Sequence, residues 1–347
     1  MKEKWKNFVP IIIVVGVIIS GILFLQNENK STTKSIFAMD TYMELTAYGR
    51  NSEQAVEAAL EEIQRLDALL STGSNTSEVT LLNKNKVGEF SEDYAYLLTR
   101  SMELFEETKG AFDITIYPIM KAWGFAGKKY CVPDDDELEA LLQNVDVSKI
   151  QYDEETRKII LPEQVEIDFG GIAKGYTSSR VAQIMKTYGI KSAIINLGGN
   201  VQAIGTKNDG SLWKVAIKSP YESLPYLGVL SVEDKAVITS GGYERYFEEN
   251  GMIYHHIIDP KTGKPAQNGL VSVTIVCKDG TLADGLSTAL FVMGKDEAID
   301  YWRAHKEEFD AVLYDENGRL YVTSGLEGSF SSDLSYEIVR ERLDTMR

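Results

Sequence analysis

Cysteine and histidine are scarce in this chain, which has 2 Cys and 3 His among 347 residues. Cys131 and Cys277 lie far apart and show no metal-ligand spacing, so the sequence predicts no cysteine-rich metal site. A disulfide between them stays open, although Cys277 ends the apolar run VSVTIVC and better fits a buried core residue. Three histidines are too few for a His-rich metal site, but one of them can still act in catalysis.

Net positive charge is also lacking. The formal net charge is -16 at pH 7, and nucleic-acid binding needs a basic surface, so we expect no nucleic-acid partner. A nucleotide ligand remains compatible with this charge if a cation mediates the contact. The central glycine-rich stretch fits neither the G-x-G-x-x-G fingerprint nor the P-loop, and no tandem repeat occurs at the period of a solenoid. The sequence therefore supports neither a Rossmann fold nor a repeat protein.

A long uncharged apolar run, Phe8–Leu25, follows three lysines at the N-terminus. This pattern is typical of a signal anchor or a cleaved signal peptide, and the anchor is favoured because no small-x-small cleavage site follows. No cysteine follows the run, so a lipoprotein processing site is absent. We therefore expect a cytoplasmic n-region (1–7), an anchor or signal peptide in contact with membrane lipid (8–25), a linker (26–36) and one extracytoplasmic domain (37–347) at the bacterial cell membrane.

The domain alternates between helix and strand patterns irregularly, which predicts a mixed α/β (α+β) layer fold. Apolar spacing predicts helices over 52–70, 134–142 and 281–293, a helix capped by Ser91 and ended by Gly110, and one over 295–305. Strand patterns occur at 37–48, 193–197, 213–217, 227–232, 236–239 and 271–277, and hairpins at 150–160 and about Asn317-Gly318. The tail, Leu334–Met346, is expected to form a closing helix.

The chain is organised around Val165–Gly205. Val165 and Ile167 alternate with polar neighbours, which predicts a short strand ending at Asp168. Gly170-Gly171 then forms a turn into a helix that carries Lys174 in its first turn. Free N–H groups at a helix start and a lysine together attract an anion such as phosphate. The alternative is a simple glycine connection, which is the commoner meaning of such a turn.

Asp284 and Thr288 lie four residues apart on a predicted helix and therefore share one face. A carboxylate and a hydroxyl supply hard oxygen ligands of the kind that Mg²⁺ prefers. The alternative is that Asp284 caps the helix and Thr288 bonds back to a carbonyl. Asp113, inside an apolar run, is either a cap or a ligand-binding carboxylate, and His256 is either a core residue or a proton acceptor.

Eight segments occur together in the order found in a known family: MDTYMEL, STGSNTSEVTLLN, GAFDITIYPIMKAWGF, IDFGGIAKGY, NLGGNVQAIG, ITSGGYERYF, HHIIDPKTGKP and ADGLSTALFVMG. They extend from about residue 38 to 294. The chain thus resembles the bacterial FAD:protein FMN transferases, the ApbE family. This resemblance implies a T-fold-like body of β-sheets with packed helices and a flavin cleft. It also implies Mg²⁺-dependent transfer of the FMN portion of FAD to a threonine hydroxyl of an acceptor protein, with release of AMP.

The resemblance assigns roles to individual positions. The residues matching FAD-contacting positions are Met39, Gly73, Ala111, Phe112, Asp113, Asp168, Lys174 and Ile258. The residues matching magnesium ligands are Gly171, through its carbonyl, Asp284 and Thr288. His256 is our hypothesis for the catalytic base. The STGS loop lacks an aromatic residue that some relatives have, so flavin stacking is not expected there.

Two other activities stay open at this point. One is a FAD pyrophosphatase, in which water replaces the threonine and FMN is released. The other is a membrane-tethered flavin-binding protein without turnover, although such a store needs no metal. For the transferase we expect an acceptor with a D/S-G-A-T-type threonine motif, such as a flavin-carrying membrane or extracytoplasmic redox protein.

Overall fold

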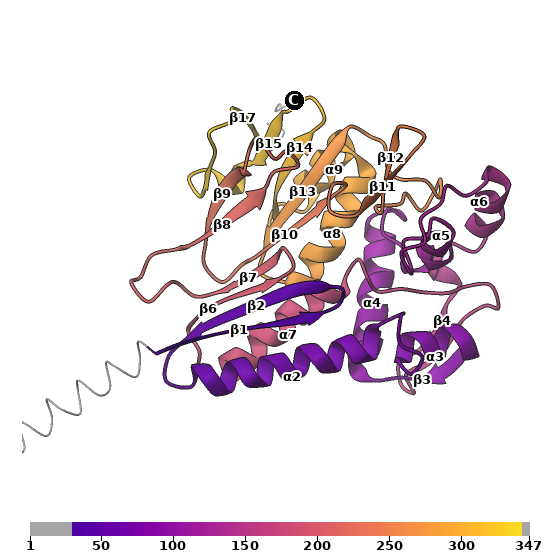
Figure 1. Cartoon of the computed structure of the whole chain (residues 1–347), viewed down its shortest axis with the longest axis horizontal. Helices are drawn as coiled ribbons and strands as arrows, with labels where there is room; N and C mark the ends of the chain where they lie inside the picture. The colour runs from indigo at the N-terminus through magenta and orange to yellow at the C-terminus, as the bar shows by residue number, and fades with distance from the viewer. Residues whose placement is uncertain (1–29, 342–347) are drawn as a thin grey trace, which may run out of the picture.

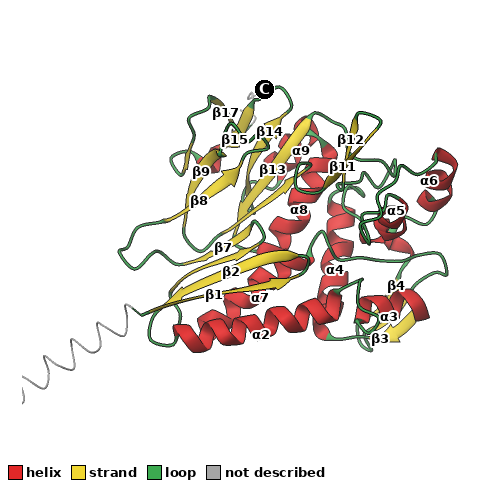
Figure 2. Cartoon of the chain, in the orientation of Figure 1, coloured by secondary structure: helices red, strands yellow, loops and turns green. Residues whose placement is uncertain are grey.

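A nine-stranded sheet runs through the computed structural model, which describes residues 30–341 (Figures 1 and 2). Its strands, in spatial order, are β1 (Ser31–Ala38), β2 (Thr41–Tyr48), β6 (Ser192–Leu197), β7 (Asn200–Ile204), β10 (Ala236–Gly241), β13 (Leu270–Cys277), β14 (Asp310–Asp315), β15 (Leu320–Thr323) and β17 (Tyr336–Val339). All neighbours are antiparallel except β15 and β17. The predicted mixed α/β fold is confirmed.

Three long helices pack against this sheet and against one another: α2 (Ser52–Leu70), α7 (Ala173–Thr187) and α8 (Gly280–Met293). Figure 1 shows α2 along the lower edge of the molecule, with α7 just above it and α8 beside β10 and β13. Ile63 and Leu66 belong to the apolar stripe of α2 and are fully buried, as the helical spacing predicts. The remaining helices are α3 (Glu78–Asn85), α4 (Glu92–Glu107), α5 (Tyr117–Ala122), α6 (Asp135–Leu142) and α9 (Lys295–Ala304), with short 3₁₀ turns η1 (Ile114–Ile116), η2 (Val147–Lys149) and η3 (Ser324–Leu326).

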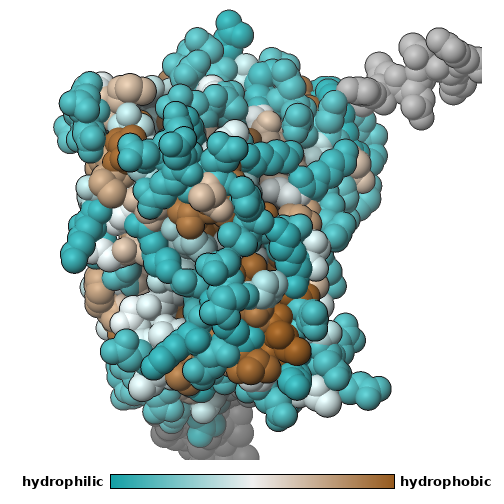
Figure 3. Space-filling model, turned by 90° about the vertical axis from the view of Figure 1, so that its right-hand side faces the viewer, coloured by the Kyte–Doolittle hydropathy of each residue, from teal (hydrophilic) through white to brown (hydrophobic). Residues whose placement is uncertain are grey.

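Three small sheets complete the fold. Their strands are β8 (Trp213–Lys218), β9 (Tyr226–Val232) and β16 (Phe330–Ser331); β3 (Val87–Glu89), β4 (Gln151–Asp153) and β5 (Lys158–Ile160); and β11 (Tyr246–Glu249) with β12 (Met252–His255). Figure 3 views the side that carries α5 and α6, where the surface is mostly hydrophilic with a larger hydrophobic area in its lower half.

The large sheet opens between β7 and β10. β10 pairs with β7 only at Ala236 and Val237, whereas it pairs with β13 along its whole length, to Gly241. Ser240 and Gly241 therefore have no β7 partner. The Ser240 side chain, at this opening, lies next to α8. The site described below lies at the same place.

Local capping confirms several predicted boundaries. Ser91 accepts a hydrogen bond from Tyr94 N at 3.3 Å at the start of α4, and Gly110 lies two residues beyond its C-cap with φ of +79°.

Cys131 and Cys277 are both free, so the disulfide alternative is wrong, and Cys277 is buried as expected.

Three predicted elements are wrong. Residues 165–167 form no strand, because the Asn83 side chain takes the place of a neighbouring strand: its Nδ2 donates to Ile167 O and its Oδ1 accepts from Ile167 N, both at 2.8 Å. The described part of the tail forms β17 rather than a helix, since it pairs in parallel with β15. The single strand predicted for 37–48 is a hairpin, because Met39 and Asp40 adopt positive φ values of 49° and 59° and reverse the chain.

The predicted linker, 26–36, is also partly structured, since residues 31–36 belong to β1 and pair with β2. Within residues 30–341, no helix is both long enough and apolar enough to cross a bilayer. The predicted n-region and anchor, residues 1–25, lie outside the described residues.

Candidate functional site

The site is built on the crossing of α7 and α8, which approach closely at two glycines. A Cβ atom on Gly175 would lie 2.1 Å from Gly280 O and 2.5 Å from Asp284 Cβ. Only a residue without a side chain fits such a gap. The crossing therefore holds Asp284, one turn into α8, against the first turn of α7.

Asp284 accepts hydrogen bonds on both carboxylate oxygens. Oδ2 accepts from Gly175 N at 2.8 Å, and Oδ1 accepts from Asn200 Nδ2 at 3.0 Å, with Lys174 Nζ 3.9 Å from Oδ1. The carboxylate is only 4% exposed. One N–H group at this helix start thus binds a carboxylate of the chain itself.

Asn200 was not among the residues predicted to act. Its side chain is 3% exposed and reaches Asp284 from the first position of β7. The signal in the sequence is only a polar residue after the Gly198-Gly199 turn, and nothing in that pattern names its partner. An amide that fixes a buried carboxylate leaves each oxygen one lone pair for a further ligand.

Thr288 lies one turn beyond Asp284, with its Oγ1 3.3 Å from Ser240 Oγ at the opening of the sheet. Gly171 lies beside it, since a Cβ on Gly171 would be 3.9 Å from Thr288 Oγ1 and 3.0 Å from Phe112 Cε2. The structure therefore brings the three predicted metal positions together, although they are widely separated in the sequence. The cap alternative is wrong, because Asp279, not Asp284, caps α8 at its start, and the recorded hydrogen-bond contact of the Thr288 hydroxyl is with Ser240.

The donor set contains one carboxylate. Among residues 30–341, no three His, Cys, Asp or Glu side chains are grouped as metal ligands. A carboxylate, a hydroxyl and a backbone carbonyl are nevertheless all hard oxygen donors, which suit Mg²⁺ when a substrate phosphate and water complete its shell. The residues present therefore fit a magnesium ion that is shared with a ligand.

Asp168 and Lys174 flank the glycine turn, as predicted. Asp168 N donates to Ile114 O at 3.0 Å, and its Oδ1 accepts from Gly170 N at 3.1 Å. Burial raises the pKa of the Asp168 carboxyl, while the Gly170 N–H and the cations of Arg245 and Lys174 oppose this rise. Arg245, which sequence reasoning missed, therefore belongs to the same charged group.

His256 faces this group from the end of β12. Its Nδ1 is 3.1 Å from Arg245 O, and a carbonyl can only accept, so the neutral ring carries its proton on Nδ1 and leaves Nε2 unprotonated. Burial first, and then the cation of Arg245, lower the pKa of His256 to about 3. His256 is thus a neutral imidazole with a free Nε2 lone pair, whereas both ring nitrogens of His255 contact backbone groups.

The segment Gly110–Asp113 has a mainly structural role. Asp113 Oδ1 accepts from Thr115 N at 2.8 Å and Thr115 Oγ1 at 2.6 Å, and its Oδ2 accepts from Val147 N at 3.2 Å. Asp113 is therefore the cap of η1, which was one of its two predicted roles. Ala111 and Phe112 are buried, and Phe112 packs against Gly171 beside the metal positions.

The other predicted FAD positions contact other parts of the chain. Met39, in the β1–β2 turn, donates its backbone N–H to Asp67 Oδ1 at 3.1 Å and lies 3.7 Å, through Sδ, from Thr177 Oγ1 on α7. Gly73 is exposed in the loop after α2 and donates to Ser71 Oγ. Ile258 is 6% exposed and packs in an apolar cluster with Ile119 and Trp123. No contact in the described residues links Gly73 or Ile258 directly to Asp284.

Comparison with known proteins agrees with the resemblance drawn from the sequence. The ApbE family model matches residues 39–313. The curated FAD:protein FMN transferase of Haemophilus influenzae is 31% identical over 314 residues, which cover 87% of this chain and 90% of that protein. Its counterpart from Treponema pallidum is 30% identical over 349 residues, with coverage of 93% and 94%.

Solved structures show the same likeness. The ApbE protein of Thermotoga maritima superposes with a TM-score of 0.81 at 32% identity, covering 86% of this chain and 99% of that one. The flavin transferase ApbE of Vibrio cholerae gives a TM-score of 0.78 at 26% identity, with the same coverage. That transferase has also been solved as a variant in which one histidine is replaced by glycine.

Proposed function

Because this chain belongs to the ApbE family, we propose that it is a transferase that moves the FMN portion of FAD onto an acceptor protein. The curated relatives that cover most of the chain are FAD:protein FMN transferases. The observation that carries the proposal is the convergence of Asp284, Thr288 and Gly171 at the start of α7. This arrangement suits a substrate with a charged pyrophosphate. In FAD, the pyrophosphate is the group that the proposed reaction cleaves.

The metal in this proposal is Mg²⁺, held by the Gly171 carbonyl, the Asp284 carboxylate and the Thr288 hydroxyl. When bound, the ion supplies positive charge to the pyrophosphate oxygens and so stabilises the charge that builds during transfer. Gly175 N and Asn200 Nδ2 orient the Asp284 carboxylate, and Ser240 Oγ lies within 3.3 Å of the Thr288 hydroxyl. A preoriented ligand set of this kind reduces the reorganisation needed when substrate binds.

Lys174 and Arg245 supply further positive charge beside Asp168. We place the flavin cleft at the opening of the sheet between β7 and β10, with the pyrophosphate near these cations. The residues proposed to form the FAD site are Met39, Gly73, Ala111, Phe112, Asp113, Asp168, Lys174 and Ile258. For Asp113, whose oxygens already bind Thr115 and Val147, the contribution to FAD binding is to hold the loop that carries Phe112.

His256 is the proposed base for a threonine hydroxyl of the acceptor. The threonine oxygen forms a new bond to the phosphorus of the FMN phosphate, the P–O bond to the AMP phosphate breaks, and AMP leaves with that bond's electrons. The threonine proton passes to Nε2 of His256, the nitrogen that the Arg245 carbonyl leaves free. The bound pyrophosphate offsets the cation of Arg245 and thereby raises the basicity of the imidazole.

Co-expression with an acceptor that carries a D/S-G-A-T-type threonine motif tests the function. We expect in-gel flavin fluorescence on the acceptor with the wild type and none with Asp284→Ala. AMP release that depends on the acceptor supports transfer. Release of free FMN without an acceptor would instead indicate a pyrophosphatase, and FAD binding with no AMP release would indicate a flavin-binding protein. Unchanged fluorescence in Asp284→Ala would contradict the metal assignment.

We also propose that the chain is held at the bacterial cell membrane by residues 8–25, with the catalytic domain on the extracytoplasmic side. The lysines before this apolar run and the polar segment after it support that orientation. Fractionation of cells followed by protease treatment of spheroplasts tests it. The expected result is a membrane-bound domain that external protease degrades; recovery in the cytosolic fraction would contradict it.

A further inference from the structure

Five polar side chains form a ring between α2, α4 and α7, outside the proposed metal and FAD sets. Tyr176 on α7 donates its hydroxyl hydrogen to Asp93 Oδ1 on α4. Arg65 Nη1 on α2 lies 2.9 Å from Asp93 Oδ2, and its Nε and Nη2 both donate to Glu62 at 2.8 Å. Glu62 Oε1 also accepts from Arg180 Nε at 3.3 Å. The ring therefore starts and ends on α7, at two residues one helical turn apart.

The charges of this ring balance. Two carboxylates, on Glu62 and Asp93, face two guanidinium groups, on Arg65 and Arg180, and the carboxylate side chains are only 10% and 15% exposed. Burial alone would raise the pKa of the Asp93 carboxyl, but the hydrogen bonds from Arg65 and Tyr176 outweigh burial and lower it. Because each carboxylate is matched by a guanidinium group, the ring acts on the helices that carry it rather than on a charged ligand.

Tyr176 directly follows Gly175, whose N–H donates to Asp284 Oδ2 at 2.8 Å. The Tyr176 side chain is buried, and its ring packs on Tyr96 of α4 with centroids 5.2 Å apart. Neighbouring side chains point about 100° apart around a helix axis, so the ring holds α7 on a different side from the one where Gly175 meets α8. Contacts on two sides of one turn fix the rotation of the helix about its axis.

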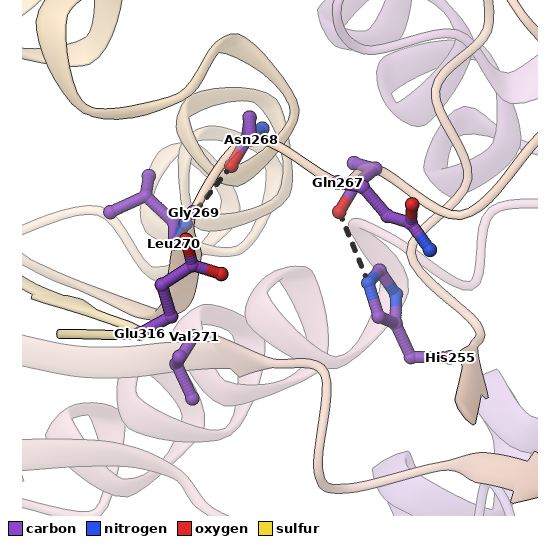
Figure 4. Close-up of a pocket in the computed structure, with 8 residues that line it drawn as sticks. His255, Gln267, Asn268, Gly269, Leu270, Val271 and Glu316 are labelled. Atoms are coloured by element: carbon purple, nitrogen blue, oxygen red, sulfur yellow. Dashed lines mark hydrogen bonds between the residues drawn. The ribbon is translucent and has the colours of Figure 1, made fainter. Parts of the chain in front are cut away.

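The other helix of the crossing, α8, is held at its C-terminal end. Asn268 Nδ2 donates to Phe291 O at 2.7 Å and to Val292 O at 3.0 Å, which satisfies two carbonyls of the last turn. Figure 4 shows Asn268 in the wall of a pocket of about 520 Å³, where its Oδ1 accepts from Leu270 N at 3.1 Å. The Asp284 carboxylate thus lies on a helix with a fixed end, and its hydrogen bond from α7 depends on how the first turn of α7 is held.

We propose that Tyr176 and Asp93 are positioning residues for the metal site. Their contact sets the rotation of the first turn of α7, and so holds the Gly175 N–H and the Lys174 ammonium group against the Asp284 carboxylate. This proposal rests on the proposed function. Because ion pairs removed from water add little net stability compared with apolar side chains, the ring's effect is to select one arrangement of the three helices.

The variant Tyr176→Phe tests this role, because it removes only the hydroxyl group. The matched control is Tyr321→Phe on β15, where another buried tyrosine donates its hydroxyl hydrogen to Asp315 Oδ2 at 3.2 Å. Neither tyrosine belongs to the proposed FAD or metal set. Titration with Mn²⁺ in the presence of FAD, followed by electron paramagnetic resonance, measures metal affinity without turnover. We also measure the free energy of unfolding in urea, the KM for the acceptor, and kcat as a function of Mg²⁺ concentration.

The expected result is a Mn²⁺ affinity lowered about tenfold in Tyr176→Phe and unchanged in Tyr321→Phe, with a similar loss of unfolding free energy in both. The kcat of Tyr176→Phe should fall at limiting Mg²⁺ and recover at saturating Mg²⁺, while its KM for the acceptor stays unchanged. Equal Mn²⁺ affinities of the two variants would overturn the proposal, because the Tyr176 hydroxyl would then serve folding alone. If Asp284→Ala binds Mn²⁺ as tightly as the wild type, the proposed metal site itself fails, and the two failures are thus distinguished.

Discussion

Gly175 N donates to Asp284 Oδ2 at 2.8 Å, a hydrogen bond that joins two residues 109 positions apart. It links the first turn of α7 to the first turns of α8 and fixes the one carboxylate of the proposed metal site. The two helices can approach this closely only because residue 175 is glycine. The packing of α7 against α8 therefore also sets the position of the Asp284 carboxylate.

Gly175→Ala is therefore expected to destabilise the protein and to weaken metal binding together. The added methyl would lie 2.1 Å from Gly280 O, and overpacking of this kind costs about 3 kcal/mol. The measurement is the free energy of unfolding in urea. Gly73→Ala is the control, because its nearest neighbour would be Ser71 Oγ at 3.5 Å, and a loss as large there would show that the close crossing is not the cause.

Asn200→Ala is expected to lower the affinity for a divalent cation about 10- to 100-fold, since residues that orient a metal ligand have effects of this size. Titration with Mn²⁺, followed by electron paramagnetic resonance in the presence of FAD, measures that affinity without turnover. Asn196→Ala provides a matched change in the same β6–β7 hairpin, at an exposed side chain that contacts Gly199 rather than Asp284. Equal Mn²⁺ affinities of the two variants would show that Asn200 does not orient a metal ligand.

His256→Gln is expected to lower the rate of flavin transfer about 100- to 10,000-fold while FAD still binds, because the loss of a general base has this magnitude. Single-turnover transfer at saturating FAD measures the chemical step directly. His305→Gln is the control, since the His305 ring lies against Tyr301 on α9 and His305 belongs to neither the proposed metal set nor the proposed FAD set. Near-normal transfer by His256→Gln at neutral pH would exclude the proposed role.

The depressed pKa of His256 also predicts a dependence of stability on pH. In the unfolded chain the imidazole takes up a proton near pH 6.5, whereas the folded state resists this until about pH 3. Stability is therefore unaffected by this group above pH 6.5 and falls as the pH decreases from 6.5 toward 3. The His256→Gln variant should lose less stability than the wild type between pH 7 and 5, and identical slopes would contradict the pKa shift. His255, whose pKa is also lowered, contributes a slope of the same sign in both proteins.

The sequence predicted those elements whose signals are local. The helix over 52–70 follows from one apolar stripe, and the hairpin about Asn317-Gly318 follows from its turn residues. The predictions at 165–167 and at the tail failed because a distant partner decides them. The Asn83 side chain hydrogen-bonds to Ile167 where a neighbouring strand would otherwise pair, and residues 336–339 form β17 because they pair with β15. Alternation and helical spacing contain no information about such partners.

The site shows the same division. Spacing on one helix made Asp284 and Thr288 candidates only, and the resemblance to the family assigned them, together with Gly171, as metal ligands. Asn200 and Arg245 could not be predicted, because their roles depend on contacts with residues far away in the sequence, 84 positions in the case of Asn200 and Asp284. The two roles suggested for Asp113 could be separated only by its observed contacts with Thr115 and Val147.

A site with one carboxylate, and with the ammonium group of Lys174 3.9 Å from it, offers little net negative charge to a divalent cation. In the proposed reaction, the pyrophosphate of the dinucleotide would supply the rest. The affinities for metal and for FAD are then thermodynamically linked: each ligand tightens the binding of the other by the same factor. We expect the ion to remain only while the dinucleotide is intact, so that cleavage into two products, each carrying one phosphate, also loosens the metal and resets the enzyme.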